Sequence, residues 1–335
     1  ALCLPREEFD EKRVADSIKE LQREFTGNSF HLHTYMGVYE IRDRDEAVSI
    51  MVDKANIAAD TIKNNYDCCV AYYDEHLLEI SIEQRRLLGE FEPALQKDEF
   101  VMYLQPQVNR DGAAKGAEAL VRWVHPSRGI LTPYAFIDIL ENAGLIYKLD
   151  LYIWEKAAQK LAEWKEKGYG SYHISVNIST KDFYIIDIYE TFTGLINKYG
   201  IAASNLHLEI TETTLMTDFE KNMNIIHKLQ GVGFRVEIDD FGSGYSSLNM
   251  LKDISADVLK IDMGFLRKSE NEVKGQDILE SIIALAGKIG MDVITEGVET
   301  KKQLDMLTMM GCHEFQGYYF SKPVPVSEFE EKYLV

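Results

Sequence analysis

The sequence predicts an α/β fold, a (β/α)8 TIM-like barrel with one antiparallel strand at its start, preceded by a small partial α+β unit. Three observations predict it. From residue 100 onward, short apolar runs alternate with helical patterns, and eight of these runs are typical of strands. Only residues 109–115 join the first two runs, too few for a crossover helix, so these two strands must form an antiparallel hairpin. Seven polar residues, mostly 20 to 36 positions apart, stand in or at the end of the strand-like runs: Glu118, Asn177, Glu209, Asp239, Lys260, Glu296 and Gln316.

The individual elements of the barrel follow from two hydrophobic periods. Short apolar runs predict strands at 100–108, 116–124, 172–178, 205–211, 234–239, 257–261, 291–295 and 313–318. Amphipathic spacing predicts helices at 133–142, 149–168, 181–199, 218–230, 244–252, 271–290 and 300–310. This alternation favours a closed barrel over an open doubly wound sheet.

The beginning of the chain has a different pattern. It predicts strands at 2–4, 31–39 and 69–73, and helices at 6–25 and 45–64. An amphipathic helix at 84–97 follows, which Pro93 should kink or restart. We therefore expect three parts: a small α+β segment at 1–83, a helical linker at 84–98 and the barrel at 99–335.

Composition excludes some partners. The chain has 335 residues, of which 46% are hydrophobic, and this is ample for a sizeable core. Its formal net charge is −19, from 55 acidic and 36 basic residues. An acidic surface is repelled by nucleic-acid polymers and by anionic membranes, so neither is expected as a partner. A small anionic ligand stays open, provided that the site supplies its own cations.

The cysteines and the start of the chain bear on its location. Cys3, Cys68, Cys69 and Cys312 show no C-x-x-C spacing, so free thiols in a reducing cytoplasm are expected. No apolar stretch approaches the roughly 18 to 20 residues of a membrane span, and no secretory signal opens the chain. Because Ala1 begins directly on a strand-like run, we expect a cytoplasmic piece of a longer protein, with sensor or membrane segments left open upstream.

The polar residues at the strand ends indicate a metal site. Two adjacent carboxylates, Asp239 and Asp240, can converge where the chain leaves the pleat, and could then hold two cations about 3.5 to 4 Å apart, the usual apparatus of phosphodiester hydrolysis. The eight histidines include no i, i+4 pair, which argues against a zinc protease. Hard oxygen donors that suit magnesium, manganese or calcium are Glu118, Asn177, Glu209, Asp239, Asp240 and Glu296.

Basic residues and a loop complete the candidate site. Lys260, aimed into the carboxylates, would stay charged and orient water or steady a pentavalent phosphate. Arg122 shares a strand face with Glu118 and is a candidate phosphate clamp. Residues 241–247, with two glycines, predict a mobile loop over the site or a turn with positive φ. A glycosidase carboxylate pair on the same fold stays an alternative.

An ordered set of motifs runs through residues 90–335: Q-P at 105, E-A-L-V-R-W from 118, V-N-I-S from 176, L-E-I-T-E from 208, D-D-F-G-S-G-Y-S-S-L from 239, L-K-I-D from 259, E-G-V-E from 296 and Q-G-Y-Y-F-S-K-P from 316. With these motifs the chain resembles the EAL-domain cyclic di-GMP phosphodiesterases. The resemblance implies metal-dependent opening of one phosphodiester of cyclic di-GMP to give linear pGpG, by a homodimer that forms through the barrel.

The resemblance also implies roles for single residues. Lys260 matches the lysine that contacts the attacking water, Glu296 could assist as its base, and Gln316 matches the glutamine that orders the metal and water network. Glu212 resembles the glutamate that anchors the loop beginning at Phe241, which couples dimerisation to metal binding. The implied ligands of two magnesium or manganese ions are Glu118, Asn177, Glu209, Asp239, Asp240 and Glu296, and the implied substrate-binding residues are Gln105, Leu120, Arg122, Asp240, Glu299 and Pro323.

Departures from the family pattern are few, namely Thr295, Met263-Gly264 and Glu237, and none removes a ligand. An active hydrolase is therefore favoured over a receptor that binds cyclic di-GMP without turnover. The first 85 residues resemble the C-terminal half of a GGDEF diguanylate cyclase domain, through Y-M-G-V-Y from 35, M-V-D-K-A-N from 51 and Y-Y-D-E from 72. The G-G-D-E-F signature is absent, so cyclase activity is not expected.

Overall fold

The computed structural model describes residues 2–25, 34–63, 68–241, 254–264 and 272–334. The chain divides into two compact units, Ala1–Glu90 and Phe91–Val335, and the division falls inside helix α3 (Glu75–Gln96). The motifs that resemble the EAL domains all belong to the second unit.

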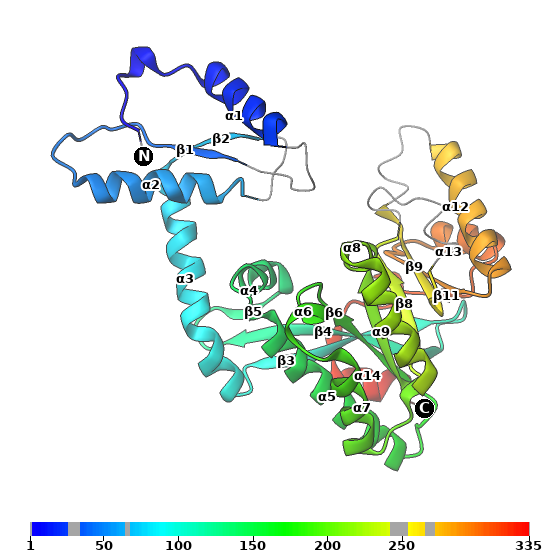
Figure 1. The fold of residues 1–335 in the computed structure, drawn as a ribbon. Helices are drawn as coiled ribbons and strands as arrows, with labels where there is room; N and C mark the ends of the chain where they lie inside the picture. The colour runs from blue at the N-terminus through cyan, green and yellow to red at the C-terminus, as the bar shows by residue number, and fades with distance from the viewer. Residues whose placement is uncertain (1, 26–33, 64–67, 242–253, 265–271, 335) are drawn as a thin grey trace. The chain divides into compact units, whose positions relative to one another are not determined.

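The first unit contains a short parallel strand pair with two helices (Figure 1). Strands β1 (Met36–Val38) and β2 (Val70–Tyr72) pair in parallel. Ile18 of α1 (Glu11–Phe25) packs in a small core with Cys69 and Val70. A Cβ on Gly37 would overlap the backbone of α2 (Val48–Asp60), so this glycine lets helix and strand approach closely.

Two expectations for this part of the chain are wrong. Residues 2–4 form no strand: the Leu2 side chain is 81% exposed, and a 3-10 turn follows at Arg6–Glu8. A strand-like pattern needs a partner strand, and this segment pairs with no described strand. Helix α3 begins nine residues before the predicted start, because Asp74 Oδ1 accepts a hydrogen bond from Leu77 N at 3.0 Å and caps it. The helix continues through Pro93 and does not restart there.

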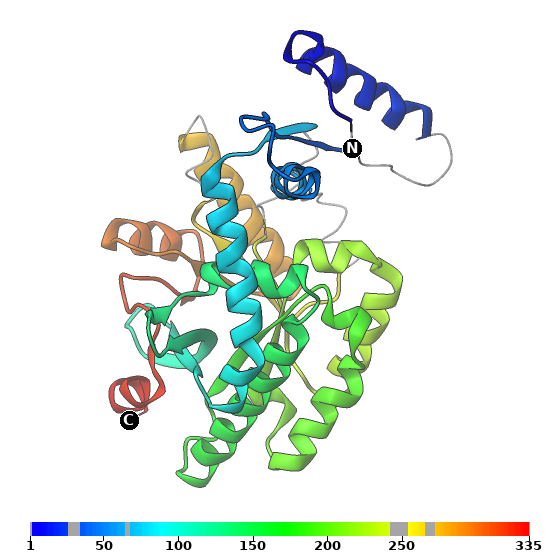
Figure 2. The ribbon, with the colours of Figure 1, turned by 90° about the vertical axis from the view of Figure 1, so that its left-hand side faces the viewer.

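The second unit is a closed barrel, and its hairpin start agrees with the prediction. Strand β3 is antiparallel to both of its neighbours, β4 and β11, whereas all other neighbouring pairs in the ring are parallel. The seven parallel strands therefore end at one face. Figures 1 and 2 show the strands of this unit with helices around them. In ring order the strands are β3 (Phe100–Val108), β4 (Ala114–His125), β6 (His173–Ile178), β7 (Leu206–Thr211), β8 (Val236–Asp239), β9 (Val258–Asp262), β10 (Asp292–Glu296) and β11 (Glu314–Phe315).

Helices cover the outside of this ring. They are α4 (Ile137–Asn142), α5 (Ile146–Glu166), α6 (Asp182–Ile185), α7 (Ile188–Tyr199), α8 (Glu212–Thr217), α9 (Phe219–Val232), α12 (Glu272–Lys288), α13 (Lys301–Met309) and α14 (Val326–Tyr333), with 3-10 turns at Pro133–Ala135 and Ala203–Asn205. Two short strands, β5 (Gly129–Leu131) and β12 (Val324–Pro325), extend the sheet. The helix predicted at 244–252 lies outside the described residues.

Two differences from the predicted helices have causes that the structure shows. The helix expected at 181–199 is two helices, because Asp187 leaves the helical conformation and accepts a hydrogen bond from Glu190 N at 3.0 Å, capping α7. Helix α14 has no counterpart among the predicted helices. It forms against α5, where the Phe329 ring stacks on Trp164 with centroids 5.6 Å apart and Glu330 accepts a hydrogen bond from the indole. A local cap thus divides the first of these helices, and tertiary packing accounts for α14.

Candidate active site

Lys260, on β9, is the centre of the site. Its side chain is fully buried, and its Nζ atom lies 2.7 Å from Glu296 Oε1 and 2.8 Å from Glu209 Oε1. Glu118 Oε2 and Asp239 Oδ1 each lie 3.5 Å away. One lysine therefore joins carboxylates from four other strands, β4, β7, β8 and β10. The parallel direction of these strands brings their C-terminal ends together and positions the five side chains.

Amide side chains hold Glu118 in place. Asn177 Nδ2 donates to Glu118 Oε1 at 3.1 Å, and Gln316 Nε2 donates to Glu118 Oε2 at 2.6 Å. The same Gln316 nitrogen lies 3.2 Å from Gln105 Oε1, and Gln105 is the residue opposite Glu118 in the β3–β4 hairpin. Gln105 Nε2 in turn donates to the Ser321 carbonyl at 3.3 Å. This network fixes the orientation of Glu118, because each of its carboxylate oxygens accepts a hydrogen bond from an amide side chain.

Burial and crowding of charge shift the pKa values of this cluster. Burial raises the pKa of Glu209 well above its ordinary value, and the neighbouring Glu118 charge adds to the rise. Burial likewise raises the pKa of Glu296 to about 8, with Lys260 opposing and Asp239 and Glu118 adding to it. Burial alone would lower the pKa of Lys260, but the surrounding carboxylates raise it well above its ordinary value. One ammonium is thus too little positive charge for these acids.

The Asp239–Asp240 pair lies where β8 ends. Asp240 has a φ of +56°, one of two positive values among the described non-glycine residues, and its N–H donates to Asp239 Oδ1 at 2.9 Å. Burial raises the pKa of Asp240, and the charges of Asp239 and Asp262 raise it further. Asp262, opposite Glu296 in the β9–β10 register, is absent from the predicted site residues. The sequence could have indicated Asp262, because it lies two residues after Lys260 and therefore on the same strand face.

The donor set fits divalent cations. Four carboxylates, from Glu118, Glu209, Asp239 and Glu296, lie within 3.5 Å of one ammonium group, and the charge of Lys260 also acts on Asp240. The Oε2 atom of Glu209 is buried and receives no hydrogen bond from the described residues. A buried, unbonded carboxylate oxygen is costly unless a cation compensates it. All-oxygen donors of this kind suit magnesium or manganese.

The structure also describes the elements and the burial of the other predicted residues. Arg122 is half-buried, with its guanidinium 5.5 Å from the Tyr103 ring centre, and burial lowers its pKa. Leu120, two residues before it, is half-buried as well. Glu299 stands in the exposed turn ahead of α13, and Pro323 is half-buried ahead of β12. Glu212 is the first residue of α8, whereas most of the loop that begins at Phe241 lies outside the described residues.

Comparisons with known proteins show which family the chain resembles. A family model described as EAL domain matches residues 89–323. The bifunctional diguanylate cyclase/cyclic di-GMP phosphodiesterase MucR of Pseudomonas aeruginosa is 32% identical over 81% of this chain and 39% of its own length. The cyclic di-GMP phosphodiesterase PdeR of Escherichia coli is 33% identical over 72% of this chain and 36% of its own. The solved structure of the PaMucR phosphodiesterase in complex with c-di-GMP is 33% identical, with a TM-score of 0.69, and covers 73% of this chain and 99% of that one.

The chain spans less than half the length of these two relatives. Among the described helices, none combines the length and the apolar character that a bilayer crossing requires.

Proposed function

Because the chain belongs to the EAL domain family, we propose that it hydrolyses cyclic di-GMP to linear pGpG. The observation that carries the proposal is the buried Lys260, within 3.5 Å of carboxylates from four strands at one face of the barrel. An ion pair with a purely structural role needs one acid for one lysine. Here several acids surround a single lysine, and further cations are needed to balance their negative charge.

The proposed cofactors are two magnesium or manganese ions, held by Glu118, Asn177, Glu209, Asp239, Asp240 and Glu296. When bound, such ions activate a water molecule and stabilise the charge on phosphate oxygens. The raised pKa of Glu296 and the unbonded oxygen of Glu209 support this assignment, because both mark negative charge that the protein alone leaves uncompensated.

In the proposed reaction a water oxygen forms a bond to one phosphorus, and the bond from that phosphorus to the 3′ oxygen breaks. Lys260 directs the water through its ammonium hydrogens, and Glu296, 2.7 Å from that ammonium, takes the proton. The 3′ oxygen takes a proton from solvent water and leaves as a hydroxyl group, and Glu296 returns its proton to solvent, so that the protons balance. Gln316 Nε2 donates to Glu118 Oε2 and would hold this carboxylate in place for an ion.

The substrate would lie over this face. Arg122 offers a cation to the phosphates, and the remaining proposed contacts come from Gln105, Leu120, Asp240, Glu299 and Pro323. Glu212 is proposed to hold the loop that begins at Phe241 and to link it to a homodimer interface through the barrel.

Chromatography of the products tests the hydrolysis. Incubation with cyclic di-GMP and Mg²⁺ or Mn²⁺ should release pGpG, and EDTA should abolish the release. Glu209→Gln should lose turnover, whereas Glu328→Gln, at an exposed acid on α14, should keep it. Binding of cyclic di-GMP without turnover in either metal would instead identify a receptor. Release of pGpG that persists in EDTA would contradict the metal role. Metal-independent hydrolysis of a glycoside, without release of pGpG, would instead favour a glycosidase-type carboxylate pair.

For the whole chain we propose a partial GGDEF-like segment at 1–83, a helical linker at 84–98 and the EAL barrel at 99–335. The division of contacts after Glu90 and the start of the family match at residue 89 support a boundary near the linker. Four cysteines without disulfide partners support a cytoplasmic location. Light scattering of the intact chain would test the proposed homodimer, and a monomer at assay concentration would contradict it.

A further inference from the structure

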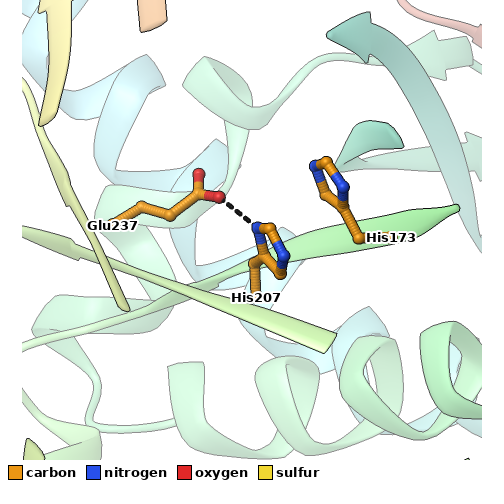
Figure 3. Close-up of side chains that lie close together, drawn as sticks. All are labelled: His173, His207 and Glu237. Carbon is orange, nitrogen blue, oxygen red and sulfur yellow. Dashed lines mark hydrogen bonds and ion pairs between the residues drawn. The ribbon is translucent and has the colours of Figure 1, made fainter. Parts of the chain in front are cut away.

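A second polar cluster lies inside the barrel, toward the N-terminal ends of the parallel strands. It consists of His173 on β6, His207 on β7 and Glu237 on β8 (Figure 3). One donor atom from each residue lies within 4.8 Å of the other two. Because side chains on one strand share a face at every second position, His207 shares a face with Glu209, and Glu237 with Asp239. The cluster is therefore one layer below the candidate active site.

Hydrogen bonds define which imidazole nitrogens face the centre of the cluster. His207 Nε2 lies 3.2 Å from the Ser204 carbonyl, which can only accept, so this nitrogen carries a proton. His173 Nε2 lies 2.7 Å from Gln107 Oε1 and likewise donates. Each ring therefore keeps its Nδ1 atom for another partner. Histidines that ligate metal ions are usually held in this way, with the second ring nitrogen donating to a carbonyl or an amide oxygen.

A cation is needed between His207 and Glu237. His207 Nδ1 lies 2.5 Å from Glu237 Oε1, as the dashed line in Figure 3 marks. In a neutral imidazole whose Nε2 carries the proton, His207 Nδ1 has a lone pair and no hydrogen. Glu237 Oε1 also presents a lone pair, so the two atoms repel at this distance unless a positive charge lies between them. A proton satisfies this requirement at the present distance. A metal ion would satisfy it once the two atoms move apart to more than about 3 Å, because each bond to the ion would be about 2.0 to 2.2 Å long. The Oε2 atom of Glu237 is buried and has no hydrogen-bond partner among the described residues.

The surroundings leave room for an ion and for adjustment of the rings. A pocket of about 570 Å³ borders all three residues, and its rim includes Lys115 and Arg235. The two imidazole rings are stacked, with centroids 3.8 Å apart and planes 4° from parallel. Since the lone pairs of parallel rings do not meet at one point, the His173 ring must turn to share an ion. A Cβ at position 116 would overlap the His173 ring, so Gly116 on the neighbouring strand β4 leaves space for this ring.

We propose that His173, His207 and Glu237 form a transition-metal site, with Zn²⁺ as the preferred ion, distinct from the oxygen-donor site at the other end of the strands. Two imidazoles and one carboxylate are a donor set typical of zinc, with bonds of about 2.0 to 2.2 Å, and magnesium does not favour nitrogen donors. Three protein ligands leave one position of a tetrahedral ion open toward the pocket. The proposal does not depend on the proposed hydrolysis, because metal binding itself is measured.

Zinc counting after equilibrium dialysis tests the proposal. Metal-free protein would be dialysed against Zn²⁺ with Mg²⁺ in large excess, and zinc per chain would be measured by mass spectrometry. The intact chain should retain one more zinc ion than His207→Gln or His173→Gln. His227→Gln, at an exposed histidine on α9, is the matched control and should bind zinc like the unchanged chain. Zinc at the active site is common to all four proteins and cancels in the comparison.

Cobalt provides a second measurement that needs no variant. Co²⁺ in a four-coordinate site with imidazole ligands absorbs visible light much more strongly than Co²⁺ held by six oxygens. The unchanged chain should show the strong absorption with one equivalent of Co²⁺, and Zn²⁺ should remove it. Gln107→Ala, which removes the acceptor that orients His173, should weaken zinc binding about 10- to 100-fold. Equal zinc in the unchanged chain and His207→Gln, or only the weak six-coordinate spectrum, would overturn the proposal.

Discussion

Replacing Lys260 with alanine removes the only ammonium group that the described structure places within 4 Å of the four clustered carboxylates. Breaking a buried ion pair from one side costs about 3 to 5 kcal/mol, because the remaining charge is left uncompensated. Since four acids lose their shared partner, we expect a loss near 5 kcal/mol in metal-free protein, against a total stability of about 5 to 15 kcal/mol for a typical protein. Divalent cations should restore much of this loss.

Turnover should respond differently from stability. If Lys260 directs the attacking water, its loss should lower turnover by about 100- to 1000-fold, as for other single groups that stabilise a transition state. Added Mg²⁺ should restore the fold of Lys260→Ala but not its rate. Urea unfolding followed by the fluorescence of the buried tryptophans gives the stability, and chromatography of pGpG gives the rate.

The matched control is Lys301→Ala. Lys301 is 58% exposed, and it pairs with Asp305 one helical turn away at 3.1 Å. Such a surface pair contributes about 0.3 to 0.5 kcal/mol, so this variant should be close to the unchanged protein in both measurements. Turnover of Lys260→Ala at the unchanged rate, or metal-free stability equal to that of the control, would refute the reasoning.

Three further predictions use other parts of the barrel. Glu118→Ala should lower turnover at least about 100-fold with an unchanged elution volume, and a normal rate would contradict the role of Glu118. Burial lowers the pKa of the His173 imidazole from 6.5 to about 3. Between these pH values only the unfolded chain binds a proton on this ring, so the contribution of His173 to stability falls as the pH falls. In EDTA the His173 contribution should fall by about 2 kcal/mol between pH 6.5 and 5. The difference in unfolding free energy between the unchanged chain and His173→Gln should change by this amount, because the buried acids contribute equally to both proteins. Thr300→Ala breaks the capping box of α13 and should cost about 1 kcal/mol in urea unfolding, without an effect on turnover.

Much of the barrel could be predicted because its signals are local. Strand β3 has the predicted bounds, and the hairpin followed from the short connection between residues 108 and 116. The strand-end residues could be grouped from their spacing alone, because parallel strands must end at one face. The close approach of Lys260 to Glu209 and Glu296 is the kind of contact that this rule anticipates.

The features that sequence reasoning missed depend on contacts between distant segments. His173 and His207 are 34 positions apart, and only the β6–β7 pairing brings their rings together. In the sequence, Glu237 stands out only as an unusual acid near Asp239. A search for histidines and acids two or four positions before the predicted strand-end ligands would have found all three, because these positions share a strand face. Helix α14 likewise depends on Trp164, which lies more than 160 positions earlier.

The reversed direction of β3 determines where the barrel is attached to what precedes it. Phe100, the first residue of β3, stands opposite Trp123 near the end of β4, and therefore at the same face as Lys260 and its acids. Helix α3 ends at Gln96, only a few residues earlier. A barrel whose first strand ran parallel to the others would be tethered at the opposite rim. Here the tether joins the barrel at the face of the proposed active site, so a pull or twist on it would reach that face without crossing the barrel.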